Sequence, residues 1–286
     1  MKCNLCPRKC NIDRKKDIGF CGQTDELKIA KVMLHKYEEP IISGSNRGSG
    51  AIFFSGCNLK CVFCQNYPIS QGGKGKFVTI SEFIDMIKKL ERRGAHNINL
   101  VSPTQYAFSI VSALKVYKPK IPIVWNSNGY ESEEMLEMLR GLVDIFLVDF
   151  KYSDNSLALK YSGAKDYVEN STKALIKMKS IQPKDIIENG LMKKGIIIRH
   201  LILPTHTSDS VKCLEFVANN LGKDSIVSIM SQYEPRYDAK QYFEINRKIK
   251  PIEYKRVVNY ALKLGLKNAY VQDLSSADSK YTPKFR

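Results

Sequence analysis

Short apolar runs alternate with longer amphipathic segments along most of this 286-residue chain. The runs are rich in Ile, Val and Phe and mostly lack period-2 alternation, which is typical of strands buried on both faces of a parallel sheet. Strands that alternate with helices imply βαβ units with right-handed crossovers. The six runs are residues 51–55, 98–101, 121–125, 145–149, 196–203 and 226–230.

The segment after the first run carries the clearest helix signal. Thr79 and Glu82 have the spacing of a capping box, apolar residues recur on one face, and Gly94 ends the pattern. The strands and helices together predict an α/β fold, a partial (β/α)6-type parallel barrel, with an open doubly wound sheet as the alternative. In a barrel, function lies at the carboxyl ends of the strands. Further helices are expected at 107–117, 132–140, 165–179, 208–220 and 251–265.

The two ends of the chain differ from its middle. The first part is rich in cysteine and irregular, with one strand expected at 27–34. No linker rich in Pro, Gly or Ser divides the rest. We therefore predict an N-terminal metal-binding segment with four cysteine ligands at 1–45, the barrel at 46–274 and a polar tail at 275–286.

Eight cysteines occur in a chain whose start has no apolar stretch of the signal-peptide type. No run is long enough to span a membrane. We therefore expect a cytoplasmic protein without membrane contact, with thiols or metal ligands rather than disulfides. The net charge of +16, from 45 basic and 29 acidic residues, favours a lysine-rich solvated surface. Binding to nucleic acid or an acidic partner is the alternative, although no known nucleic-acid-binding motif accompanies the charge.

Cys57, Cys61 and Cys64 follow the first apolar run within the sequence GCNLKCVFC. Three thiolates on one loop can bind a [4Fe–4S] cluster and leave one iron open to another ligand. A structural zinc site would need a fourth protein ligand, and neither His nor Cys follows in this loop. The spacing therefore predicts an open iron–sulfur cluster.

The C-x3-C-x2-C motif, with Phe63 before its last cysteine, resembles the signature of radical S-adenosylmethionine (SAM) enzymes. Over most of the chain the sequence is similar to proteins like the activating enzyme of pyruvate formate-lyase. The resemblance implies that a cluster on Cys57, Cys61 and Cys64 binds SAM and cleaves it to a 5′-deoxyadenosyl radical. The matching segments are CNLCPRKC, LHKYEEPIISG, FFSGCNLKCVFCQNYPIS, NSNG, DFK and RHLILP.

The resemblance also implies roles for polar residues within strands or at their ends. Asn126, Ser127, Asn128 and Gly129 match a family motif that contacts ribose and a cation, although Asn126 stands where the family has Asp. Asp149 and Lys151 match the family's Asp-x-Lys. Arg199 matches an arginine near the SAM carboxylate. Because a charged pair after an apolar run is a poor core choice, Asp149 and Lys151 are expected to line a cavity or to form a strand-end ion pair.

The end of the second run departs from the family pattern. Most of the superfamily has a Gly-Gly-Glu motif there that holds the amino group of SAM. This chain has Ser102, Pro103, Thr104 and Gln105. We expect Ser102, Thr104 and Gln105 to accept that hydrogen bond, more weakly than a carboxylate would.

A second set of cysteines, Cys3, Cys6, Cys10 and Cys21, precedes the barrel. Four thiolates suffice for a closed site that holds either zinc or a second iron–sulfur cluster. Spacing does not decide between them, and zinc is slightly favoured because no ferredoxin-like insert is visible. The remaining Cys213 lies at a helical apolar position and is expected to be a buried thiol.

The function expected from the sequence is radical SAM chemistry, with a glycine of a partner enzyme as the leading substrate. A peptide, RNA or small molecule is the alternative substrate. A metal-stapled nucleic-acid-binding module is the alternative of another class. A reductant such as flavodoxin or ferredoxin is the expected electron donor.

Period-2 alternation also predicts that Arg199 and its neighbour His200 point to opposite faces of their strand.

Overall fold

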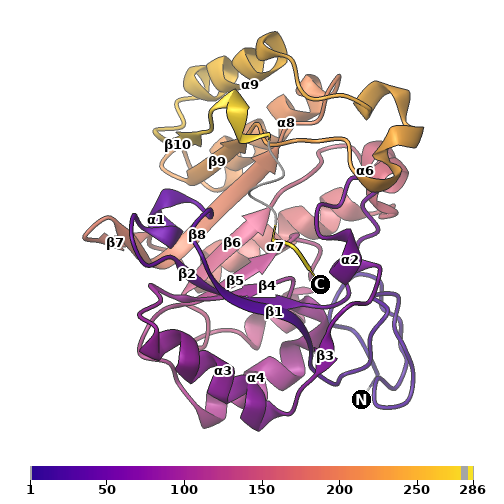
Figure 1. Ribbon diagram of the computed structural model, residues 1–286. Helices are drawn as coiled ribbons and strands as arrows, with labels where there is room; N and C mark the ends of the chain where they lie inside the picture. The colour runs from indigo at the N-terminus through magenta and orange to yellow at the C-terminus, as the bar shows by residue number, and fades with distance from the viewer. Residues whose placement is uncertain (1, 278–282, 286) are drawn as a thin grey trace.

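The structure is a computed structural model that describes residues 2–277 and 283–285, so residues 278–282 and 286 of the expected tail lie outside it. It is an α/β fold (Figure 1). The strands are β1 (Lys28–His35), β2 (Ser49–Phe54), β3 (Lys76–Phe77), β4 (Ile98–Val101), β5 (Ile123–Ser127), β6 (Ile145–Asp149), β7 (Ile186–Glu188), β8 (Leu191–Leu201), β9 (Ile226–Met230) and β10 (Asn268–Val271). The helices are α1 (Pro40–Ser43), α2 (Tyr67–Ser70), α3 (Ile80–Arg92), α4 (Ala107–Val116), α5 (Glu133–Glu137), α6 (Asn155–Ser162), α7 (Tyr167–Ile181), α8 (Thr207–Asn220) and α9 (Pro251–Lys263).

One mostly parallel sheet organises the fold, in the order β10-β9-β8-β6-β5-β4-β2-β1-β3. Neighbours from β2 to β10 pair in parallel, consistent with the predicted partial barrel. All six expected strands of the barrel and the strand expected at 27–34 are present, whereas β3, β7 and β10 were not expected. β1 pairs with β2 in the antiparallel direction, and β7 forms an antiparallel hairpin with β8. β1 lies within the predicted segment 1–45 and pairs with β2, the first strand of the predicted barrel.

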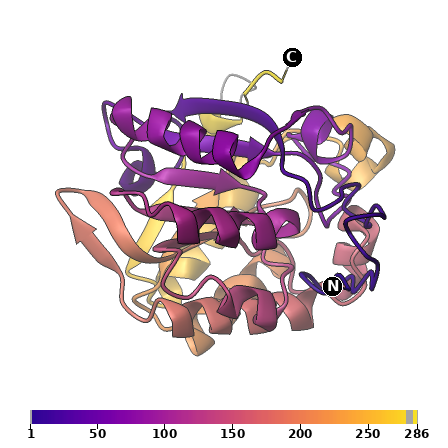
Figure 2. The same ribbon diagram turned by 90° about the horizontal axis from the view of Figure 1, so that it is seen from below.

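Helices follow the parallel strands and lie along the outside of the sheet (Figure 2). The expected capping box of α3 is present: Thr79 accepts the Glu82 N–H, while Glu82 accepts the Thr79 N–H. Its apolar face buries Phe83, Ile87 and Leu90. The helix expected at 165–179 is present as α7, and α6 precedes it as a helix that was not expected. No helix in the described residues is long and apolar enough to cross a membrane.

The short helix α1 covers the inside of the sheet. Its Ile41 and Ile42 pack with Val124, Leu147 and Ile197 from three parallel strands. This packing fixes the two residues just before the helix, Glu38 and Glu39, in the buried interior.

Residues 2–27 form no helix or strand and lie on the side of the molecule that carries α2 and α6 (Figure 1). Backbone hydrogen bonds between Cys3 and Ile12 and between Asn11 and Cys3 close the first loop. Cys3 and Leu5 are buried in the main core. At the other end of the chain, the Phe285 ring contacts Phe53 of β2, with ring centroids 5.5 Å apart.

Candidate active site

A cavity of about 230 Å³ lies at the carboxyl ends of the parallel strands, where the barrel prediction places function. It collects residues from the loop after β2 and from the ends of β4, β5, β6 and β8. Most of the residues singled out in the sequence line this cavity. They are Cys57, Cys61, Cys64, Ser102, Asn126, Ser127, Asn128, Asp149, Lys151 and Arg199, together with Glu38.

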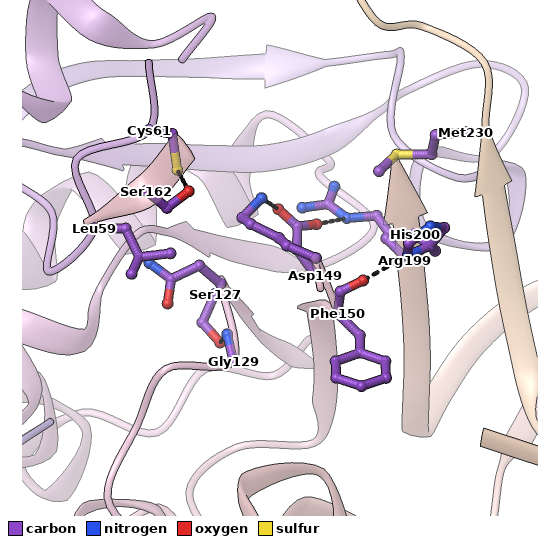
Figure 3. A network of polar contacts seen from close by, with 12 residues as sticks. Leu59, Cys61, Ser127, Gly129, Asp149, Phe150, Ser162, Arg199, His200 and Met230 are labelled. Atoms are coloured by element: carbon purple, nitrogen blue, oxygen red, sulfur yellow. Dashed lines mark hydrogen bonds and ion pairs between the residues drawn. The ribbon is translucent and has the colours of Figure 1, made fainter. Parts of the chain in front are cut away.

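Hydrogen-bond donors surround the cysteine sulfurs of the loop. Ser162 Oγ donates to Cys61 Sγ at 3.0 Å (Figure 3). The Leu59 N–H and the Asn128 side-chain amide both donate to Cys57 Sγ, each at 3.4 Å. Donors to sulfur stabilise thiolates bound to iron–sulfur clusters. All three thiols face one cavity with room beyond them, so the donor set fits a cluster with an open iron.

Burial keeps these thiols neutral when no metal is bound. Removal from water raises the pKa of Cys57 to about 12 and that of Cys64 to about 11. A metal must therefore displace their protons for the thiolates to form. Within the described part of the chain, no three or more His, Cys, Asp or Glu residues form a ready site for a single ion. A cluster does not require such a site, because each thiolate binds a different iron.

A chain of buried charges forms the wall opposite the cysteines (Figure 3). Asp149 accepts hydrogen bonds from Arg199 Nε at 2.7 Å and from Lys151 Nζ at 2.8 Å. The three side chains are between 14% and 19% exposed. Burial alone would raise the pKa of Asp149, but the positive charges of Arg199 and Lys151 outweigh it and lower that pKa. The Asp149 carboxylate is therefore held ionised between two cations.

Glu38 is a member of this charge network that the sequence did not identify. Its carboxylate pairs with Arg199 Nη1 at 3.1 Å and accepts side-chain hydrogen bonds from Asn99 at 3.2 Å and Asn126 at 3.4 Å. Burial raises the pKa of Glu38, while the charge of Arg199 opposes that shift. The only signal in the sequence was the position of Glu38 inside the matching segment LHKYEEPIISG.

The side chains at the end of β5 and just after it point in different directions. Asn126 Oδ1 accepts a hydrogen bond from Arg199 Nη2 at 2.8 Å, and Asn128 donates to Asn58 Oδ1 at 2.7 Å. The Ser127 hydroxyl donates to Glu131 at 2.7 Å. Asn126 therefore bonds to the charge network and Asn128 to the cysteine loop, whereas the hydroxyl of Ser127 is engaged by Glu131.

Of the three residues expected to hold the SAM amino group, only Ser102 lines the main cavity. Thr104 donates to Glu131 at 2.8 Å, and the Gln105 amide donates to the carbonyls of Ser55 and Gly56. Both side chains turn away because residues 104–106 form a 3₁₀ helix directly after β4. In the structure, therefore, the Thr104 and Gln105 side chains bond to other parts of the protein and do not line the main cavity. Ser102 itself has a positive φ of 56°, a strained conformation that is frequent at functional sites.

Glu131 is a second buried carboxylate that the sequence did not identify. It is 2% exposed and accepts hydrogen bonds from Trp125, Ser127 and Thr104. Burial raises its pKa, and the three donors oppose that shift. Its partners lie on two neighbouring strand ends, so Glu131 fixes the strand ends around the cavity.

The second set of cysteines also converges. Cys3, Cys6, Cys10 and Cys21 line one smaller cavity between the N-terminal segment and the barrel. Cys213 lies apart from both sets, buried in α8 as expected. All eight cysteines are free thiols.

His200 lies on the opposite face of β8 from Arg199, as the alternation predicted (Figure 3). It is 2% exposed, and its Nδ1 lies 2.7 Å from the Phe150 carbonyl oxygen. Burial lowers its pKa to about 4. At a pH between about 4 and the ordinary histidine pKa, His200 is therefore protonated in the unfolded chain but neutral in the folded chain.

The His200→Asn variant should lose less stability in acid than the wild type. The pKa of His200 in the unfolded chain is about 6.5. Between about pH 7 and about pH 5, we therefore expect the free energy of unfolding to fall by about 2 kcal/mol more in the wild type than in the variant. Asparagine keeps a donor for the Phe150 carbonyl but does not titrate. Urea unfolding of both metal-free proteins at the two pH values measures the difference. Parallel losses in the two proteins would show that His200 is not responsible.

A comparison with known proteins identifies a family whose cofactors fit the residues of this cavity. The model of the Radical SAM superfamily matches residues 51–216. The uncharacterized protein MJ0674 of Methanocaldococcus jannaschii is 34% identical over 94% of this chain and 76% of its own length.

Two solved structures share the fold at low sequence identity. SuiB of Streptococcus suis, bound to its precursor peptide SuiA, has a TM-score of 0.52 and 14% identity over 76% of this chain and 46% of its own. The FeFe-hydrogenase maturase HydG of Carboxydothermus hydrogenoformans has a TM-score of 0.52 and 14% identity over 75% of this chain and 50% of its own. The chain thus spans about half the length of these two proteins.

The family model covers more than half of the chain, including all three cysteines of the loop, Asp149 and Arg199. The family implies a [4Fe–4S] cluster and SAM as cofactors, which agrees with the thiols and charged groups of the main cavity. The chain belongs to the radical SAM superfamily of enzymes.

Proposed function

We propose that this enzyme cleaves SAM reductively and uses the resulting 5′-deoxyadenosyl radical to take a hydrogen atom from a glycine in a partner enzyme. The observation that carries the reaction type is the convergence of three loop thiols and a buried Asp149–Arg199–Lys151 network on one cavity. Cys57, Cys61 and Cys64 would hold a [4Fe–4S] cluster, which would supply the one electron needed to split the sulfonium carbon–sulfur bond of SAM into methionine and the radical. Hydrogen transfer then gives 5′-deoxyadenosine and a substrate radical.

We infer that the charged wall of the cavity binds the methionine part of SAM. Arg199 and Lys151 carry the positive charges that a carboxylate needs, and Asp149 holds both in place. Of the three candidates for the SAM amino group, Ser102 is the one that lines this cavity. Asn126 and Asn128 lie between this wall and the cysteine loop, in a position to contact the adenosyl part.

Formation of 5′-deoxyadenosine tests the reaction type directly. The full chain is reconstituted anaerobically with iron and sulfide, reduced with dithionite and mixed with SAM. Chromatography should then detect 5′-deoxyadenosine and methionine in equal amounts. A reconstituted protein that binds its cluster but yields no 5′-deoxyadenosine would refute the proposal.

The proposed substrate, a backbone glycine, rests on the similarity to activating enzymes of the pyruvate formate-lyase type. The alternatives are a peptide, RNA or a small molecule. A peptide has some support, since the structural neighbour SuiB is bound to a precursor peptide. Deuterium separates these substrates: with partner proteins labelled at the glycine α-carbon, deuterium should appear in 5′-deoxyadenosine. Label transfer from peptides, RNA or small molecules instead would exclude the glycine.

We propose flavodoxin or ferredoxin as the reductant, with the net charge of +16 favouring an acidic donor protein.

We further propose zinc or a second iron–sulfur cluster on Cys3, Cys6, Cys10 and Cys21. A nucleic-acid-binding role rests on charge alone. Such binding must weaken steeply as salt rises, and a flat salt dependence would exclude it.

Glu38 should tune the affinity for SAM through Arg199. In the Glu38→Gln variant, Arg199 loses one of its two carboxylate partners and is held less firmly against the cavity. We expect the Kd for SAM to rise roughly tenfold, the effect of losing one charge-assisted hydrogen bond. Equilibrium dialysis with the cluster-loaded protein measures this. The exposed Glu188→Gln variant is the control, and equal Kd values in the two variants would contradict the role of Glu38.

A further inference from the structure

We propose that Cys3, Cys6, Cys10 and Cys21 form a four-thiolate metal centre that fastens the N-terminal segment onto the loop of Cys57, Cys61 and Cys64. This role goes beyond SAM cleavage, because it concerns how the loop is held rather than what the loop catalyses. It needs neither SAM nor substrate, so it can fail or hold independently of the proposed reaction.

The four cysteines meet around a cavity of about 10 Å³, which has room for roughly one water-sized group. Gly19 lies between two of them: a Cβ at this position would be 3.4 Å from Cys21 Sγ and 3.7 Å from Cys10 Sγ. The Phe20 N–H donates to Cys10 Sγ at 3.4 Å. Four thiols around one small space, one of them already accepting an N–H bond, are a suitable donor set for zinc or an iron–sulfur cluster.

The N-terminal segment needs such a crosslink because it has little core of its own. Residues 2–27 form only an isolated bridge between Lys2 and Asp13. Ile18 is 68% exposed and Phe20 is 41% exposed. Because no finished single-ion site exists among the described side chains, the binding of one zinc ion would require the sulfurs to move together. Metal binding would then be part of the folding of this segment.

The N-terminal segment contacts the loop of Cys57, Cys61 and Cys64 directly. The Cys57 N–H donates to the Cys21 carbonyl at 3.3 Å. A backbone hydrogen bond therefore joins one cysteine of the N-terminal set to one cysteine of the loop. Gly56, with φ 82°, allows this approach, since a Cβ there would lie 2.7 Å from the Cys21 carbonyl oxygen. Only glycine suits both the conformation and the contact.

Arg8, between Cys6 and Cys10, provides a second link. Its Nε donates to the Asn58 carbonyl at 3.0 Å, and its Nη1 donates to the Gly163 carbonyl at 2.6 Å. Gly163 follows Ser162, the donor to Cys61 Sγ. The guanidinium also lies over the Phe20 ring at 3.9 Å from its centroid. Arg8 therefore holds both backbone stretches that position Cys57 and Cys61.

Metal content and cluster lifetime test the proposal in the full chain. Wild-type protein should hold about four irons plus one zinc, or about eight irons if the second centre is a cluster. The Cys6→Ser variant should lose the additional metal but still take up about four irons. Its iron should then be lost to a chelator several-fold faster than in the wild type. Cys213→Ala, which removes a thiol outside both sets, should match the wild type in both measurements.

The Arg8→Met variant tests the link without removing a ligand. It should keep the additional metal and still lose cluster iron several-fold faster than the wild type. Circular dichroism shows whether each variant keeps the barrel folded. If Cys6→Ser unfolds, the cluster lifetime of Arg8→Met alone tests the fastening role. Wild-type protein with about four irons and no zinc would overturn the metal centre. An unchanged cluster lifetime in folded Cys6→Ser and Arg8→Met would overturn the fastening role.

Discussion

Replacing Cys61 with alanine should abolish formation of 5′-deoxyadenosine and remove most of the iron bound at the main cavity. Cys61 is 9% exposed and faces the cavity between Cys57 and Cys64. A loop with two thiolates would lack one of the three proposed protein ligands, so the cluster would be held at too few points. We expect activity to fall by roughly a thousandfold or more, because the reaction has no alternative electron source.

Iron analysis and chromatography of the anaerobically reconstituted variant measure this effect. The Cys213→Ala variant is the matched control, since it also removes one buried thiol but lies in α8, away from the cavity. A Cys61→Ala protein that retained the iron content and activity of this control would show that the cluster is bound elsewhere.

Replacing Arg199 with methionine should strongly destabilise the fold, even without cofactors. Arg199 pairs with Asp149 and Glu38 while only 14% of its side chain is exposed. Its removal leaves two carboxylates close together, with Lys151 as the remaining cation beside Asp149. Losing one partner of a buried charge pair commonly costs about 3–5 kcal/mol. We expect the free energy of unfolding in urea to fall by about this amount.

The control for Arg199 is Arg140→Met, which breaks an exposed ion pair with Glu137. It should leave the free energy of unfolding unchanged within error, because water screens exposed pairs. Arg199→Lys keeps the charge but cannot reach Asp149, Glu38 and Asn126 at once, so its stability should lie between the other two. Equal stabilities for Arg199→Met and Arg140→Met would show that the network contributes little to folding.

The strands and the cysteine loop were predictable because their signals are local. An apolar run without alternation identifies a buried strand such as β6 or β9 wherever it occurs. Cys57, Cys61 and Cys64 lie within eight residues, so their spacing alone brings the thiols to one loop. Asp149 and Arg199 stand within strands that the sequence identified, and the register of β6 with β8 places them side by side.

The partners of these residues come from distant parts of the chain. Glu38 is 161 residues from Arg199 in sequence, and only the packing of α1 inside the sheet brings the two together. Glu131 likewise lies beneath two strand ends and takes up the hydroxyls of Thr104 and Ser127. Thr104 therefore turns away from the cavity toward a buried partner, which no local pattern indicated.

The sequence by itself determined the α/β class, the cysteine loop and the charged strand ends, since each depends on spacing or periodicity along one short segment. Only the tertiary structure decided which polar groups face the cavity, and that the N-terminal cysteines lie against the loop of Cys57, Cys61 and Cys64. These depend on contacts such as that between Cys21 and Cys57, which form when separate segments pack. The direction of a side chain at a strand end follows from its buried partner, and that partner belongs to another element.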